Sequence, residues 1–126
     1  MTVLDTSFLV DLERRVPGAV RTWQALMAGG ARLRVPAAAW VEFLHILPPA
    51  ARTKAEEELE RHASFEPFSR ELANLAVRLQ HDLASQGRRA GWHDLQIACT
   101  AIHLGEDLVS SDAGFDAFAG LSRRGW

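Results

Sequence analysis

Acidic side chains follow two short apolar runs that the sequence predicts to be strands. Asp5 comes directly after residues 2–4, and Asp112 comes after residues 108–109 and a polar Ser-Ser turn. In an open α/β sheet, functional groups gather in the crevice outside the carboxyl ends of the strands. Both carboxylates are therefore expected at that edge of the sheet.

Two further acids lie in predicted helices. Asp94 lies in the first turn of the helix expected between Gly91 and Gly105, because apolar residues recur there at helical spacing and Gly105 supplies a stop. Glu42 lies in an apolar helical segment, where a carboxylate is costly unless it faces water, a partner or a metal. A parallel sheet would bring all four acids to one edge.

Four neighbouring carboxylates raise one another's pKa and cannot all stay ionised without a counter-charge. A divalent cation supplies that charge, and an oxygen-rich site without a cysteine ligand suits Mg²⁺ or Mn²⁺. Such an ion binds a phosphate oxygen and lowers the pKa of a bound water, which is the chemistry that phosphodiester hydrolysis needs. The sequence leaves open whether one or two ions bind. The five histidines do not have the spacing of a His-Glu-x-x-His metal motif.

The composition indicates one ordinary globular domain over residues 1–126. The hydrophobic share is 48% and the charged share is 24%, which disfavours disorder. No apolar run approaches the roughly 20 residues of a membrane helix, and the N-terminus lacks the basic start of a signal peptide. We therefore expect a cytoplasmic protein that does not contact a membrane.

The net charge is −2, so the chain is not a polycation that binds nucleic acid by bulk attraction, and any basic surface must be local. Arginine pairs occur at residues 14–15, 88–89 and 123–124. We interpret these pairs as composition bias and solvated faces in preference to phosphate contacts. The one cysteine, Cys99, lies on a predicted apolar helix face, which indicates core packing.

Short strands alternate with helices along the chain, and this order predicts an α/β fold with a parallel sheet covered on both faces. Strands are expected near residues 2–4, 32–35, 63–68 and 108–109, with a further edge strand within residues 118–126. Thr6 or Ser7 is expected to cap the first helix. Phe43, Leu44 and Leu47 are expected to offer apolar surface for a dimer.

The order of four short motifs resembles the PIN domain family, and more narrowly the VapC-type toxins of type II toxin–antitoxin pairs. The motifs are Val3-Leu4-Asp5-Thr6-Ser7, Val41-Glu42-Phe43, His93-Asp94-Leu95-Gln96-Ile97-Ala98 and Leu108-Val109-Ser110-Ser111-Asp112-Ala113-Gly114-Phe115. The resemblance spans nearly the whole chain. It implies an α/β/α sandwich with a central parallel sheet of four or five strands, Mg²⁺- or Mn²⁺-dependent cleavage of RNA, a homodimer and a cognate antitoxin.

The resemblance also implies roles for individual residues. The three aspartates of the motifs match metal-ligating acids, Glu42 matches an acid that orients metal or water, and all four acids are catalytic candidates. Hydroxyl groups beside them are expected to support the ligands through hydrogen bonds, namely those of Thr6, Ser7 and Ser110. Asp107 and Asp116 lie close to Asp112 in sequence, and Asp116 in particular is an alternative for the fourth acid.

Three other functions compete with this interpretation. One is a PIN nuclease outside any toxin pair, which acts in RNA processing or on DNA. Another is a catalytically silent binding module, although such a module has no reason to assemble mutually repelling acids. The third is a phosphotransfer fold with a phosphorylated Asp5. Ser7 stands where such enzymes commonly have a second aspartate, and no suitable late lysine is present.

Overall fold

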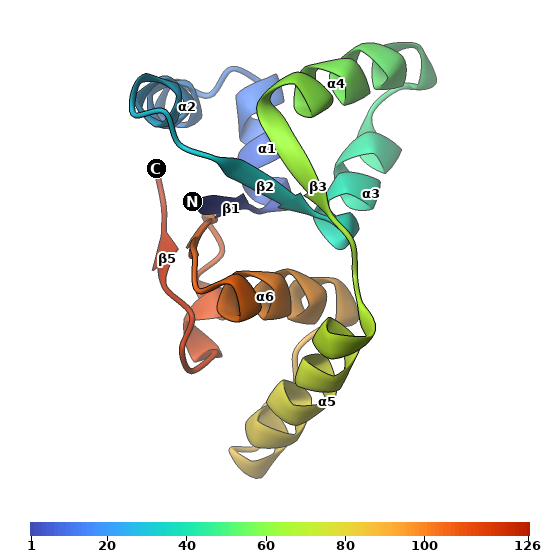
Figure 1. Cartoon of the computed structure of the whole chain (residues 1–126), viewed down its shortest axis with the longest axis vertical. Helices are drawn as coiled ribbons and strands as arrows, with labels where there is room; N and C mark the ends of the chain where they lie inside the picture. Colours follow the sequence, from blue (N-terminus) through green and yellow to red (C-terminus); the bar gives the residue numbers. More distant parts are fainter.

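Five short strands form one parallel sheet, with helices packed on both of its faces (Figure 1). The computed structural model describes residues 1–126. The strands are β1 (Thr2–Leu4), β2 (Leu33–Pro36), β3 (Ala63–Glu66), β4 (Asp107–Val109) and β5 (Arg123–Arg124). The α-helices are α1 (Thr6–Glu13), α2 (Pro17–Ala28), α3 (Ala37–Ile46), α4 (Pro49–His62), α5 (Arg70–Ser85) and α6 (Trp92–Leu104), and a 3₁₀ helix, η1, spans Ala113–Ala117.

The strand order is β3-β2-β1-β4-β5, which makes β1 the central strand. The chain leaves β1 towards β2 on one side and later returns to pair β4 on the other, so the carboxyl end of β1 is a topological switch point. Leu4 pairs with Val109 in register. Asp5 and Ser110, the next residues on each strand, are therefore neighbours across the sheet.

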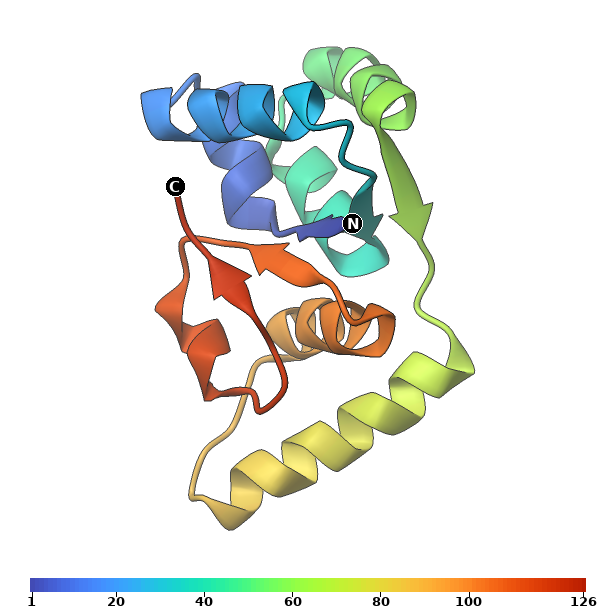
Figure 2. The same ribbon diagram turned by 60° about the vertical axis from the view of Figure 1, so that its left-hand side comes forward.

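The helices form two layers around the sheet, as Figures 1 and 2 show: α1, α2 and α4 lie on one side, and α5 and α6 lie on the other. Helix α3 begins directly after β2 and packs against both α1 and α6. The predicted α/β/α sandwich is confirmed, with five parallel strands. The expected late edge strand is β5, beside β4.

Apolar residues from the strands and from one face of each helix make a single core. Val3, Leu4, Leu108 and Val109 are fully buried on the central strands. Cys99 is fully buried on α6, and burial raises the pKa of its thiol to about 11, so its expected role in packing is confirmed. None of the helices is both long enough and apolar enough to cross a bilayer.

Two local expectations were wrong. The N-cap residue of α1 is Asp5, and neither Thr6 nor Ser7 caps the helix through its side chain. Phe43 is 4% exposed in the core of its own chain, so it offers no surface to a dimer, whereas Val41 and Ile46 on the same helix are exposed. The periodicity of α3 alone does not show which of its two apolar faces meets the sheet.

A charged network links β2, β3 and the residue before β4. Arg34 on β2 bonds through its guanidinium to Glu66 at the end of β3 and, at 3.0 Å, to Glu106 just before β4. The hydrogen bond to Glu66, opposed by burial and assisted by Glu106, raises the pKa of Arg34. The Glu106 side chain is 5% exposed, and its second oxygen has no partner. Arg34 is therefore the counter-charge of a buried carboxylate.

Candidate metal centre

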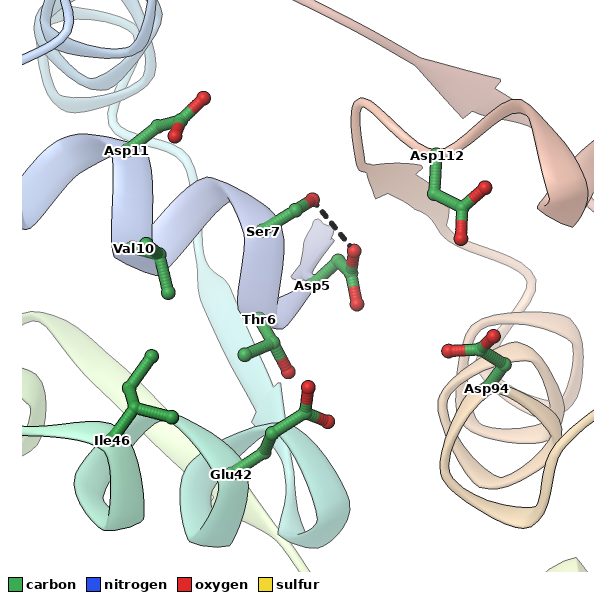
Figure 3. A pocket seen from close by; sticks show the side chains of 9 residues that line it. All are labelled: Asp5, Thr6, Ser7, Val10, Asp11, Glu42, Ile46, Asp94 and Asp112. Atoms are coloured by element: carbon green, nitrogen blue, oxygen red, sulfur yellow. Dashed lines mark hydrogen bonds between the residues drawn. The ribbon is translucent and has the colours of Figure 1, made fainter.

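A cavity of about 310 Å³ opens at the carboxyl end of β1, between α1, α3, α6 and the turn that follows β4 (Figure 3). The residues that line it are Asp5, Thr6, Ser7, Val10, Asp11, Glu42, Ile46, Asp94 and Asp112. All four acids predicted from the sequence lie in this one cavity. The structure also places the predicted hydroxyl residues Thr6 and Ser7 there, and Ser110 lies beneath them.

Asp5 is the buried anchor of the cavity. Its side chain is reached by two hydroxyl donors, because Ser7 Oγ and Ser110 Oγ each donate to Oδ2 at 2.7 Å. Ser110 is fully buried and Asp5 is 5% exposed, so this arrangement is shielded from solvent. Both bonds fall on one oxygen, which leaves Oδ1 free to face the cavity.

Asp112 is held by hydrogen bonds within the turn that follows β4. Its backbone N–H donates to Ser110 Oγ at 3.0 Å, and its Oδ1 accepts from the N–H of Gly114 at 2.8 Å, where it caps η1. Asp116 does not line the cavity. Both of its carboxylate oxygens instead accept hydrogen bonds from Arg123, at 2.9 and 3.0 Å. These bonds hold the pKa of Asp116 below its usual range.

Glu42 and Asp94 face each other from α3 and α6 (Figure 3). His93 Nδ1 lies 3.2 Å from Glu42 Oε2, so the residue before Asp94 contacts the acid on the opposite helix. The contact joins residues 51 positions apart, and no local pattern reports such a pair.

The cavity concentrates negative charge. Five of its nine lining residues are Asp or Glu, and none is Lys or Arg. Partial burial, followed by the charges of Asp112, Asp5 and Glu42, raises the pKa of Asp94 above its usual value, while His93 opposes the shift. The folded chain therefore holds Asp94 in a place that disfavours its ionised form unless a cation is present.

Asp11 is a cavity residue that the sequence interpretation missed. It lies four residues after Ser7 on α1, so both project from the same face of the helix. Trp126 Nε1 donates to Asp11 Oδ2 at 3.1 Å, and the Trp126 ring packs edge-on against Phe8. The helical spacing from Ser7 could have identified Asp11 from the sequence. The hydrogen bond from Trp126 could not have been predicted from a local pattern.

The donors around the cavity suit a hard divalent cation. They are carboxylate and hydroxyl oxygens, and Thr6 Oγ1 is buried there without a hydrogen-bond partner. No three acidic, histidine or cysteine side chains are arranged closely enough to hold an ion by themselves. Mg²⁺ commonly takes one or two carboxylates and keeps several waters, so Asp5 and its neighbours fit an ion whose other ligands are water.

A family model described as the PIN domain matches residues 2–121. The chain belongs to the PIN domain family. A comparison with curated proteins found no match. The match covers all five acidic residues of the cavity and the whole sheet except β5, so the site described above lies inside the PIN domain.

Solved structures share this PIN fold over nearly the whole chain. VapBC2 from Rickettsia felis, bound to a DNA fragment from its promoter, matches with a TM-score of 0.86 at 18% identity, covering 99% of this chain and 98% of the other. DNA-bound VapBC from Salmonella typhimurium gives 0.86 at 18% identity, covering 99% and 97%. VapC20 from Mycobacterium tuberculosis, a sarcin-ricin loop cleaving toxin, gives 0.73 at 18% identity, covering 97% and 99%.

Proposed function

We propose that this PIN domain is a metal-dependent endoribonuclease that hydrolyses RNA phosphodiester bonds, and that it is the toxin of a type II toxin–antitoxin pair. The observation that carries the proposal is the convergence of five carboxylates in one cavity at the switch point of the sheet, with no lysine or arginine in the lining. Its likeness in fold to VapC20, a sarcin-ricin loop cleaving toxin, supports RNA as the substrate class.

The residues divide into three roles under this proposal. Asp5, Asp94 and Asp112 would hold Mg²⁺ or Mn²⁺ together with its bound waters, and the ion when bound would supply positive charge to a phosphate oxygen and acidify a water. Glu42 would accept the proton of the water that attacks the phosphorus, while the P–O bond to the leaving ribose oxygen breaks and that oxygen takes a proton from solvent. The hydroxyls of Ser7 and Ser110 fix Asp5 so that Oδ1 faces the reacting groups.

We also propose that the chain binds two protein partners and acts in the cytoplasm. One partner is a cognate antitoxin, which is supported by the VapBC complexes among the structural neighbours. The other is a second copy of the chain, for which the exposed Val41 and Ile46 on α3 supply apolar surface. The proposed place of action is the cytoplasm, which holds the RNA substrate.

Cleavage of a mixed RNA pool and of matched single-stranded DNA tests the proposal. Each substrate is incubated with the protein in Mg²⁺, in Mn²⁺ and in chelator. We expect products from RNA alone and only when metal is present. Equal cleavage of DNA would move the chain to PIN nucleases outside toxin pairs. Absence of cleavage in every condition would leave a binding module.

A further inference from the structure

A second cavity, of about 440 Å³, adjoins the acidic one. We call it the arginine groove, and its lining includes the loop between α5 and α6, the start of α6, and η1. Arg88 and Arg89 lie at its solvent side, while Leu83, Phe115 and Phe118 form a buried apolar wall. The groove therefore combines positive charge with an apolar surface, unlike the acidic cavity.

The two arginines are available to a ligand. Both are exposed, and neither guanidinium takes part in any ion pair or hydrogen bond of the structure, in contrast to Arg34 and Arg123. An arginine without an internal partner presents five N–H donors in a planar fork that matches a phosphate. The sequence interpretation preferred a solvated face to phosphate contacts; both arginines are exposed, and both also line the groove.

The loop that carries the pair is fixed in place. Gln80 on α5 bonds both backbone groups of Ala90: its Nε2 donates to Ala90 O at 2.9 Å, and its Oε1 accepts from Ala90 N–H at 3.1 Å. The N–H of Arg88 donates to Leu83 O at 2.8 Å. The backbone is thus held at Arg88 and at Ala90, on either side of Arg89, so the loop itself needs little ordering on binding.

Asp94 lines both cavities, so the arginine groove lies next to the acidic cavity. A strand whose phosphate lies against the acids would place a neighbouring nucleotide in the groove. We propose that the arginine groove binds the nucleotide next to the scissile phosphate, with Arg88 and Arg89 on the strand's phosphates and the apolar wall against its sugar or base. This proposal rests on the proposed ribonuclease function.

The test compares two double variants that each remove two positive charges from a chain of net charge −2. Arg88→Gln/Arg89→Gln changes the groove. Arg14→Gln/Arg15→Gln is the matched control, because that adjacent pair is also exposed and unpaired but lines neither cavity. A fluorescent single-stranded RNA is titrated into wild type and both variants in chelator at several salt concentrations, and cleavage rates are measured in Mg²⁺.

We expect the groove variant to bind RNA about tenfold or more weakly than the control variant. Its salt dependence should be flatter by roughly 1.4 in log–log slope, the amount for two phosphates on a single strand. Equal RNA affinity in both double variants would overturn the proposal. RNA binding in chelator tests the groove without any cleavage. Cleavage by the wild type in Mg²⁺ tests the ribonuclease function separately.

Discussion

Replacement of Asp94 by Asn should lower RNA cleavage by about 10³-fold and, in chelator, make the folded protein slightly more stable. The loss of activity follows because a carboxylate aimed at the cation becomes a neutral amide. The gain in stability follows because burial and three neighbouring acids already disfavour the charge of Asp94. Its size should stay below about 1 kcal/mol, since water screens this partly exposed group.

The pH dependence of this gain has a fixed sign. The pKa of Asp94 is raised in the folded state, so between the unfolded and folded values the folded chain binds more protons. Wild-type stability in chelator should therefore fall, relative to Asp94→Asn, as pH rises through that window. The difference should vanish below the unfolded pKa. Thermal unfolding in chelator from acidic to neutral pH measures it.

Asp116→Asn is the matched control for this prediction. Asp116 lies in η1, four residues after Asp112, and is bound to Arg123 outside the cavity. This variant should keep its cleavage activity, and it tests the alternative assignment of the fourth acid. Added Mg²⁺ should raise the Tm of wild type and of Asp116→Asn by linkage, and leave that of Asp94→Asn nearly unchanged. An active Asp94→Asn would contradict the assigned role.

Replacement of Arg34 by Met should destabilise the fold by about 3 kcal/mol, because it leaves the Glu106 carboxylate buried without its counter-charge. For a chain of this size, such a loss should lower the Tm by roughly 10 °C. Chemical denaturation gives the free energy of unfolding directly. The additional change Glu106→Leu should recover much of the loss, since it removes the stranded charge.

Arg61→Met is the control for the Arg34 prediction. Arg61 also pairs with a glutamate, Glu58, but their side chains are 62% and 49% exposed. An exposed pair contributes less than about 1 kcal/mol, so this variant should unfold close to wild type. A similar small effect at Arg34 would mean that water reaches Glu106 and that the network does not stabilise the sheet.

Local patterns were sufficient to predict the acids of the site. Asp5 and Asp112 follow strands and Asp94 begins a helix, and in a parallel sheet those positions share one edge whatever the strand order. Two roles were expected for Ser7. Its hydroxyl donates to Asp5, as expected of a hydroxyl beside a ligand, and it does not cap α1.

Contacts between distant segments were outside the reach of the sequence patterns. The pairing of Glu42 with His93 depends on how α3 crosses α6, and the hydrogen bond from Trp126 to Asp11 depends on how residue 126 packs against α1. Register decides that Ser110 supports Asp5, because β1 and β4 must first pair. The arginine groove likewise exists only once η1 packs beside the loop between α5 and α6.

Binding of Mn²⁺, followed by the loss of the free-ion electron paramagnetic resonance signal, tests most directly that the cavity acids form one cation site. The titration uses wild type, Asp5→Asn and Asp116→Asn, and needs no substrate. We predict that wild type and Asp116→Asn bind the ion, and that Asp5→Asn loses most of the affinity. Equal binding by all three proteins, or no binding by wild type, would contradict the account.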